Sequence, residues 1–230
     1  MLQLGSHPIE AIAFDLDGTL IDSAPDIHAA LAAGFVEAGL TAPTLAAVRG
    51  WIGDGPDRLI AEALAAAGIA RPGLPERLRA AFDRHTLAAP VAHGGPYAGM
   101  PELLATLHGR VPLVVISNKP SHLGRAVLEA AGILGRFEFV QGADTPPMRK
   151  PAPAMLVAAA HRLDVPRRSL LMVGDGPADL GAAERAGCPA VWAAWGYGAI
   201  DPAGPRIDAP GDLLSLLTDL TNGTEAYAPT

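Results

Sequence analysis

From about residue 95 onward, short apolar runs alternate with stretches that have the hydrophobic period of a helix. The apolar runs have the length of strands and lie at residues 111–118, 137–142, 169–175 and 189–195. The helical patterns lie at residues 100–109, 121–132, 152–163 and 178–187. An earlier apolar run at residues 11–14 completes the set. Strands that alternate with helices form parallel sheets, so the order predicts an α/β protein with a doubly wound, Rossmann-like parallel sheet.

The segment between the first two strands has only helical patterns and turn signals. Helices are expected at residues 23–39, where Ser23 would be the N-cap and Asp26 follows three residues later, and at residues 55–68 and 75–87. The segment is too long and too strongly patterned to be a loop. We therefore predict a core of residues 1–22 and 94–230, with an inserted helical domain of residues 23–93. The last ten residues, "TNGTEAYAPT", are expected to be frayed.

Composition restricts the class of protein. The 230 residues have a formal net charge of -7, which argues against a nucleic-acid partner, since such proteins normally have a basic stripe. The single cysteine, Cys188, excludes an intrachain disulfide and fits a reducing compartment. The first residues show no signal peptide, and no apolar run approaches the roughly 18 residues of a membrane span. We expect a soluble cytoplasmic protein with no membrane partner, either a monomer or a homodimer.

Polar residues stand where the predicted strands end. Asp15 and Asp17 follow the first strand, and Ser117 and Asn118 end the next. Further along the chain come Lys150 at a helix start, Asp175 at a strand end and Asp179 one turn later. In open α/β sheets, ligands bind at the carboxyl ends of the strands. The sequence therefore predicts that these residues meet at one edge of the sheet.

This set of residues suits phosphoryl transfer. Asp15 and Asp175, with a backbone carbonyl or water, offer the hard oxygen ligands that Mg²⁺ prefers. One carboxylate can attack phosphorus, and a second can protonate the leaving alkoxide and then activate water. Ser117 and Lys150 would bind the phosphoryl oxygens, and Gly18 permits a tight turn whose backbone N–H groups approach the phosphate. Each piece alone has an ordinary structural explanation, but four segments in this order are rarely a coincidence.

The stretches "DLDGTLIDS", "SNKP", "RKP" and "GDGPAD" resemble the four motifs of the haloacid dehalogenase (HAD) superfamily, over residues 9 to about 215. The inserted helices are placed like that superfamily's α-helical cap. The resemblance implies Asp15 as nucleophile and Asp17 as general acid and base. It also implies Mg²⁺ held by Asp15, Asp175 and the backbone carbonyl of Asp17, with Asp179 orienting that site. The phosphate-binding residues would be Gly18, Thr19, Ser117, Asn118 and Lys150.

Several activities remain open within and beyond this resemblance. Asp17 favours a phosphate ester over an organic halide, because release of halide needs no proton. Within the superfamily the motifs are most similar to those of phosphoglycolate phosphatases, so a small phosphate ester such as 2-phosphoglycolate is the expected substrate. A sugar phosphate, a nucleotide or a phosphomutase reaction are alternatives. A phospho-accepting signalling module also groups acids, a hydroxyl and a lysine, but it needs neither a cap nor Asp17.

The loop "GWIGDGPDRL" within the helical insertion has two interpretations. Gly53 and Gly55 leave backbone N–H groups uncovered before a helix that starts near Pro56, and such a helix start binds anions. With Asp54 between the two glycines and Arg58 in the first turn, these four residues are the candidate substrate contacts of a loop that would close over the phosphate and hold a substrate carboxylate. Alternatively, Asp54 is simply the cap of an ordinary helix.

Overall fold

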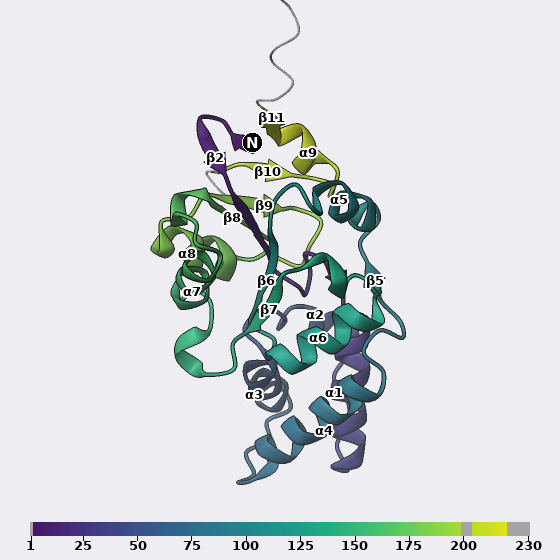
Figure 1. Ribbon diagram of the computed structural model, residues 1–230. Coiled ribbons are helices and arrows are strands. Elements are labelled where there is room, and N and C mark those ends of the chain that lie inside the picture. Colours follow the sequence, from purple (N-terminus) through teal and green to yellow (C-terminus); the bar gives the residue numbers. More distant parts are fainter. Residues whose placement is uncertain (1, 199–203, 220–230) are drawn as a thin grey trace, which may run out of the picture.

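The computed structural model of the chain describes residues 2–198 and 204–219. At its centre lies a parallel sheet of six strands in the order β10-β9-β8-β3-β6-β7 (Figure 1). In chain order the strands are β3 (Ala11–Phe14), β6 (Leu113–Ser117), β7 (Phe139–Gly142), β8 (Leu170–Gly174), β9 (Ala190–Ala193) and β10 (Arg206–Ile207). Strand β3 pairs with β6 on one side and with β8 on the other. The chain thus winds outward from β3 in both directions, which confirms the predicted fold class.

Helices cover both faces of this sheet, because successive residues of a strand point to opposite faces. Ile12 and Phe14 of β3 pack in one core with α5 and α6, while Ala11 and Ala13 pack in a second core with α7 and α8. The second core is rich in alanine, so these helices lie close to the sheet. The four helices are α5 (Met100–Leu107), α6 (Ser121–Ala130), α7 (Ala154–Leu163) and α8 (Pro177–Ala186). Their observed ends lie within two residues of the predicted ones.

Four further helices lie between β3 and β6 in the chain and extend from one end of the sheet (Figure 1). They are α1 (Ala24–Glu37), α2 (Leu45–Arg49), α3 (Pro56–Ala66) and α4 (Leu74–Ala88). These helices have a hydrophobic core of their own, which includes Phe35, Leu59 and Phe82. The chain enters and leaves this helical segment through two short antiparallel strands, β4 (Ile21–Asp22) and β5 (Gly95–Pro96). The two connections to the sheet therefore lie side by side.

The start of α1 differs in detail from the predicted cap. Ser23 is the N-cap residue, but its backbone is in the helical region (φ -93°, ψ -5°) and its side chain makes no cap hydrogen bond. Its hydroxyl donates to Asp17 at 2.7 Å. The carboxylate of Asp26 is buried and accepts the backbone N–H groups of residues 92, 93 and 94, each at 2.9 Å. Asp26 thus fastens the returning connection to the beginning of the helical segment.

Short elements complete the structure. A second, antiparallel sheet has the order β11-β1-β2 and joins the beginning of the chain to its later part. Its strands are β1 (Leu2–Leu4), β2 (His7–Ile9) and β11 (Leu217–Asp219), and α9 (Asp212–Leu216) precedes the last of them. Strands of three residues are too short to give a hydrophobic period, which is why the sequence did not indicate them. Single 3₁₀ turns occur at Leu134–Arg136, Pro146–Met148 and Arg167–Ser169. The tail expected to be frayed, residues 221–230, lies outside the described residues.

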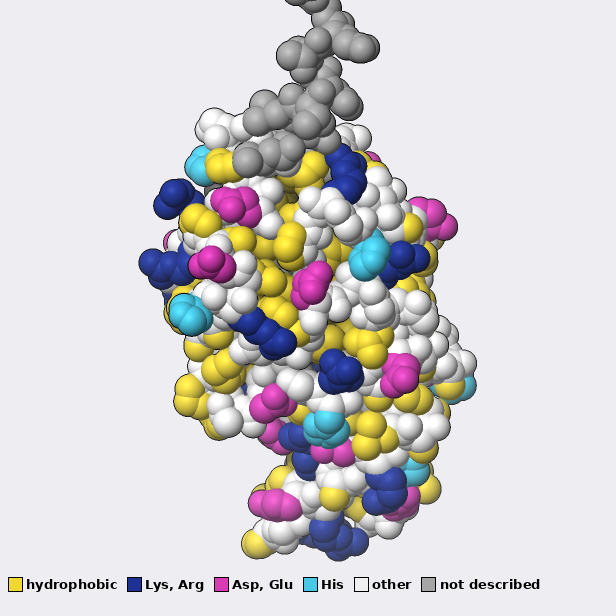
Figure 2. Space-filling view, in the orientation of Figure 1, with side chains coloured by type: hydrophobic (Ala, Val, Ile, Leu, Met, Phe, Trp, Pro, Cys, Tyr) yellow, Lys and Arg dark blue, Asp and Glu magenta, His cyan; other side chains and the backbone are white. Residues whose placement is uncertain are grey.

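The face of the molecule in Figure 2 mixes side chains of all kinds. Basic and acidic side chains lie interspersed over the sheet's helices and over the helical segment (Figure 2). Across residues 2–198 and 204–219, no helix has both the length and the apolar character needed to cross a membrane.

Candidate active site

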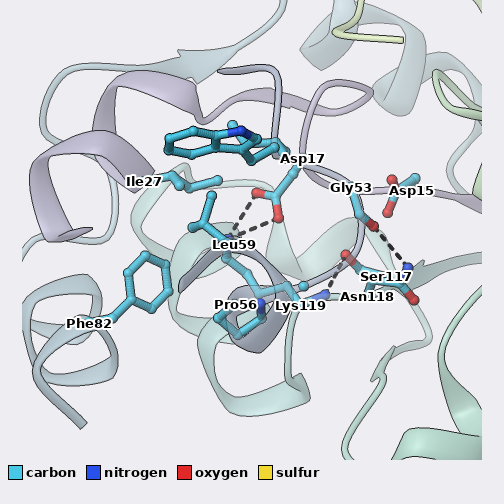
Figure 3. A pocket seen from close by; sticks show the side chains of 13 residues that line it. Asp15, Asp17, Ile27, Gly53, Pro56, Leu59, Phe82, Ser117, Asn118 and Lys119 are labelled. Atoms are coloured by element: carbon cyan, nitrogen blue, oxygen red, sulfur yellow. Dashed lines mark hydrogen bonds and ion pairs between the residues drawn. The ribbon is translucent and has the colours of Figure 1, made fainter. Parts of the chain in front are cut away.

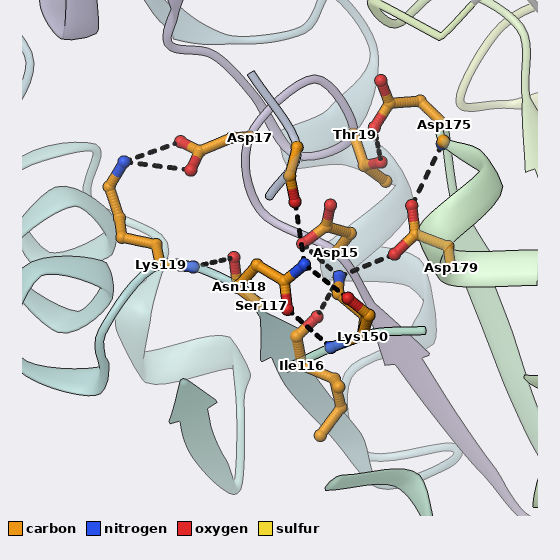
Figure 4. A network of polar contacts seen from close by, with 12 residues as sticks. Asp15, Asp17, Thr19, Ile116, Ser117, Asn118, Lys119, Lys150, Asp175 and Asp179 are labelled. Atoms are coloured by element: carbon orange, nitrogen blue, oxygen red, sulfur yellow. Dashed lines mark hydrogen bonds and ion pairs between the residues drawn. The ribbon is translucent and has the colours of Figure 1, made fainter. Parts of the chain in front are cut away.

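Three strands of the central sheet bring carboxylates and a hydroxyl to one edge. Asp15 directly follows β3, Ser117 ends β6 and Asp175 directly follows β8. These strands are parallel neighbours, so their carboxyl ends meet as predicted (Figure 4). Asp179, one turn into α8, completes a buried cluster with Asp15 and Asp175, in which one oxygen of each carboxylate lies within 4.8 Å of the others.

Lys150 lies beneath this cluster and is fully buried. Its ammonium is 2.8 Å from Asp15 Oδ1 and 2.6 Å from Asp179 Oδ1, and it donates to the backbone carbonyl of Ile116 at 2.8 Å. Among the described residues the buried Oδ1 of Asp15 has no hydrogen-bond partner, so its contact with Lys150 is an ion pair, while Ile116 and Asp179 accept hydrogen bonds from the ammonium. Burial alone would lower the pKa of Lys150, but the charges of Asp15 and Asp179 outweigh it and raise that pKa. Lys150 is therefore held as a cation against the carboxylate of Asp15.

The cluster is short of positive charge. Burial, and then the nearby charge of Asp179, raises the pKa of Asp15 to about 7. Burial, and then the charge of Asp15, raises the pKa of Asp175 to about 6. When all three carboxylates of the cluster are ionised, their three negative charges face the single positive charge of Lys150. Hard oxygen ligands with excess negative charge are what a divalent cation binds, so these residues could hold a metal ion.

Asp17 faces away from that cluster and has different partners. The ammonium of Lys119 lies 3.0 Å from its Oδ1 and 2.9 Å from its Oδ2 (Figure 4). The Ser23 hydroxyl also donates to Oδ1. The side chains of Lys119 and Asp17 are 4% and 13% exposed. An ion pair this deeply placed is held in one geometry, since separating it would leave a buried charge unpaired.

Two cavities lie between the sheet edge and the helical segment. The first, called here the inner cavity, has a volume of about 30 Å³ and lies between Asp15, Asp17 and Lys119 on one side and apolar residues of the helical segment on the other (Figure 3). The second, the outer cavity, has a volume of about 310 Å³ and is lined by the three-carboxylate cluster, Arg49 and Tyr197, among others. Asp15 and Asp17 line both cavities, so both carboxylates are open to a molecule bound there.

The loop that precedes α3 lines the cavities on the side of the helical segment. Gly53 lines both cavities, Gly55 lines the inner one and Asp54 the outer one. The backbone of Gly55 has φ +83°, and a Cβ there would lie 2.7 Å from the carbonyl oxygen of Asn118, so only glycine fits this close approach. Gly55, and not Asp54, is the N-cap of α3. The alternative of Asp54 as a helix cap is therefore wrong.

Arg58 is not at the site. Its side chain is 58% exposed and pairs with Glu62 one turn further along α3, at 2.6 Å. Leu59 and Ile60 occupy the buried face of this helix, so Arg58 points to solvent. The expectation that Arg58 holds a substrate carboxylate is corrected by this placement.

Gly18 and Thr19, two of the residues expected to bind phosphate, use their polar groups in hydrogen bonds within the protein. The N–H of Gly18 donates to the carbonyl of Ile21 at 2.9 Å, and a Cβ at Gly18 would lie 2.5 Å from Asp175, so this glycine makes room for the cluster. The hydroxyl of Thr19 donates to Asp175 Oδ1 at 2.9 Å and is fully buried. These two residues position Asp175, and their direct contact with phosphate stays a prediction.

The side chain of Asn118 is likewise engaged. Its amide nitrogen donates to the carbonyls of Gly53 (2.8 Å) and Lys150 (3.1 Å), and its oxygen accepts the N–H of Lys150 (2.7 Å). Asn118 thus fastens the α3 loop to the sheet edge, and its amide is not free for a phosphate. Ser117 lines the inner cavity, where its hydroxyl oxygen accepts the N–H of Lys119 and its proton remains available to donate.

Three residues at the site escaped the sequence analysis. Lys119 belongs to the stretch "SNKP", and only its contact with Asp17 shows what it does. Tyr197 donates its backbone N–H to Asp175 at 2.7 Å and its hydroxyl to Asp22 at 2.8 Å, and Arg49 lies over the Tyr197 ring. The tryptophan, tyrosine and glycines of "WGYG" could have signalled a close approach near the last strand, because small and aromatic residues there suit tight contact with a site.

Comparison with known proteins agrees with this architecture. The family model of haloacid dehalogenase-like hydrolases matches residues 9–187, which is most of the chain. The chain therefore belongs to this family of hydrolases and is an enzyme, as its motifs predicted.

Within the family, the chain resembles phosphoglycolate phosphatases. It is 35% identical over 218 residues to the phosphoglycolate phosphatase of Photobacterium profundum, covering 92% of this chain and 95% of that one. It is 40% identical over 178 residues to the phosphoglycolate phosphatase of Cereibacter sphaeroides, covering 76% and 81%. The crystal structure of a predicted phosphoglycolate phosphatase from Haemophilus somnus superposes with a TM-score of 0.83 at 26% identity, covering 90% and 97%.

Proposed function

We propose that the protein hydrolyses a small phosphate monoester, with 2-phosphoglycolate as the best candidate, through a phospho-aspartate at Asp15. The observation that supports this most directly is that Asp15 and Asp17 both line the two cavities beneath the α3 loop, while Asp15 also belongs to the buried cluster. One carboxylate is therefore placed beside a cation site and the other beside the cavity that a leaving group would fill. The names of the relatives support the choice of substrate.

In this proposal the protein works in two steps. A carboxylate oxygen of Asp15 forms a bond to phosphorus, the bond from phosphorus to the leaving oxygen breaks, and Asp17 gives that oxygen its proton. Asp17 then takes a proton from water as the water oxygen attacks phosphorus, which frees Asp15 and inorganic phosphate. Lys150 offsets the charge of Asp15 through their ion pair and is proposed to bind the phosphoryl group as well. The Ser117 hydroxyl is also a side-chain donor available for a phosphoryl oxygen.

The metal in this proposal is Mg²⁺, held by Asp15, Asp175 and the backbone carbonyl of Asp17. Asp179 orients this site, with one oxygen bound to Lys150 and the other to the N–H of Gly176 at 3.0 Å. When bound, Mg²⁺ would supply positive charge to the phosphoryl oxygens and offset the repulsion among the carboxylates.

The proposal includes a division of labour between two parts of the chain. Residues 23–93 act as a cap over a phosphatase core of residues 1–22 and 94–230. The separate hydrophobic core of α1–α4 and the paired connections β4 and β5 support this division. The free thiol of Cys188 is consistent with a reducing compartment, and we propose the cytoplasm as the location.

A screen of phosphate monoesters tests the proposal, with released phosphate measured in the presence of Mg²⁺ or of excess EDTA. We expect turnover only with Mg²⁺ and no activity in Asp15→Asn. Asp17→Asn should slow turnover by roughly 10²–10⁴-fold, as is typical for loss of a general acid and base. The exposed Asp208→Asn is the matched control and should keep full activity.

Three results would contradict this assignment. Full activity in EDTA would refute the metal-dependent site. Substantial activity in Asp15→Asn together with none in Asp17→Asn would reverse the two roles. A lasting phospho-aspartate after treatment with acetyl phosphate, without turnover, would indicate a signalling module, and transfer of phosphate to a second hydroxyl would indicate a mutase.

A further inference from the structure

Lys119 is the cation that the structure places next to the general acid. It lies in the loop between β6 and α6, and its side chain is 4% exposed. The acceptors recorded for its ammonium, within the described part of the chain, are the two oxygens of Asp17. Asp17 also has the Ser23 hydroxyl as a donor, so it does not depend on Lys119 alone.

On the side of the helical segment, the side chains that face the inner cavity are apolar apart from the indole N–H of Trp51. The wall of the inner cavity opposite the sheet consists of Ile27, Trp51, Ile52, Leu59 and Phe82 (Figure 3). Among the described residues that line this cavity, Lys119 is the one cation. A charge in a cavity with apolar walls interacts more strongly with an opposite charge than it does in water. A leaving group that enters here therefore meets Lys119 as the one positively charged group in the described lining.

The size of the cavity limits what can enter. With a volume of about 30 Å³, the inner cavity has room for only a few atoms in this arrangement of the helices. A larger leaving group would have to extend beyond it, for example into the outer cavity, which shares Asp15 and Asp17. A leaving group of two or three carbon atoms is compatible with the space.

We infer that Lys119 determines substrate specificity by binding the carboxylate of a small anionic leaving group. The inference rests on the proposed phosphatase function and adds the residue that recognises the leaving group. An ammonium has three donors, so Lys119 can bind a substrate carboxylate while it keeps a contact with Asp17. This places the carboxylate end of the substrate beside Asp17 and its phosphoryl end over Asp15. Lys119 thus takes the part that the sequence suggested for Arg58.

The test compares two substrates of similar size. 2-Phosphoglycolate has a carboxylate where 2-hydroxyethyl phosphate has an uncharged hydroxyl-bearing carbon. We expect the unaltered enzyme to prefer 2-phosphoglycolate in kcat/KM by roughly tenfold or more, as expected for one charge-assisted hydrogen bond in an apolar cavity. Lys119→Met should remove this preference. Arg125→Met is the matched control, because it removes an exposed positive charge further along α6 and should keep the preference.

The outcomes separate this inference from the proposed function. Equal losses for both substrates in Lys119→Met would mean that Lys119 acts only through Asp17, and the inference would be wrong. An unaltered enzyme that hydrolyses both esters equally well would also overturn it, even if Lys119→Met and a second variant, Lys119→Gln, failed to fold. Thermal melting of each variant shows whether it is folded. Absence of hydrolysis for every ester in the screen would instead refute the proposed phosphatase function.

Discussion

Replacing Asp175 by asparagine should reverse part of the pH dependence of stability. Burial and the charge of Asp15 raise the pKa of Asp175 from 3.8 to about 6 in the folded, metal-free protein. A carboxyl group whose pKa is raised by folding is protonated more readily in the folded state. The contribution of Asp175 to the free energy of unfolding is therefore most favourable below about pH 4, and it is lost as the pH rises to about 6. At about 1.4 kcal/mol per pH unit, the loss amounts to roughly 3 kcal/mol.

Asp175→Asn cannot titrate, so it escapes this loss. The free energy of unfolding of the variant, relative to the unaltered protein, should rise by about 2 kcal/mol between about pH 4.5 and pH 7.5. Asparagine keeps one acceptor oxygen and replaces the other with a donor, which disturbs the contact with the N–H of Tyr197. That cost is the same at every pH, so the slope with pH tests the reasoning and the absolute difference does not.

Urea unfolding in EDTA, followed by circular dichroism at several pH values, measures this slope. Asp208→Asn removes an exposed carboxylate and serves as the control. Added Mg²⁺ should stabilise the unaltered protein at pH 7.5 more than it stabilises Asp175→Asn, because the variant lacks one anionic ligand. If the difference in free energy of unfolding between the variant and the unaltered protein did not change with pH, the claim that folding raises the pKa of Asp175 would be refuted.

Other expectations follow from single contacts. Arg58→Ala should leave KM for 2-phosphoglycolate unchanged within about twofold, since an exposed helical ion pair contributes little; steady-state kinetics would show otherwise by a large rise in KM. Asp26→Ala should lower the free energy of unfolding by about 2–4 kcal/mol, because three backbone N–H groups lose a charged acceptor; a loss near zero in urea unfolding would contradict this. Burial raises the pKa of Cys188 to about 11, so iodoacetamide should alkylate it slowly at pH 8 in the folded protein and rapidly in urea, as mass spectrometry can measure. Ca²⁺ should inhibit the Mg²⁺-supported reaction in the phosphate-release assay, because its longer bonds and looser geometry would misplace Asp15.

The fold and the edge where the site lies could be predicted because both depend on local patterns. Alternating strand and helix periods specify a parallel sheet, and a parallel sheet brings the carboxyl ends of its strands together. Asp15, Ser117 and Asp175 could therefore be placed from their positions at strand ends. The short strands β1, β2 and β11 could not, since three residues give no period and their pairing joins opposite ends of the chain.

The direction of individual side chains was harder to predict. Arg58 was assigned from its position in the first turn of α3, but the direction of its side chain depends on which face of that helix is buried. The pattern of Leu59 and Ala63 beside an Arg58–Glu62 pair already indicates that face, because residues four apart lie on the same side of a helix. The spacing of apolar residues along α3 would therefore have placed the side chain of Arg58 in solvent.

Contacts between distant segments decide what the predicted residues do. Asn118 was expected to bind phosphate from its position after β6, but Gly53, 65 residues earlier, takes one of its amide donors. The chemistry of the site thus depends on how closely the α3 loop approaches the sheet edge, which no local pattern in either segment describes. The same approach buries Lys119 against Asp17 and gives the inner cavity its apolar wall. A motif residue with no role assigned from the sequence, such as Lys119, can therefore have a role as specific as its neighbours, and that role becomes visible only when the opposing surface is known.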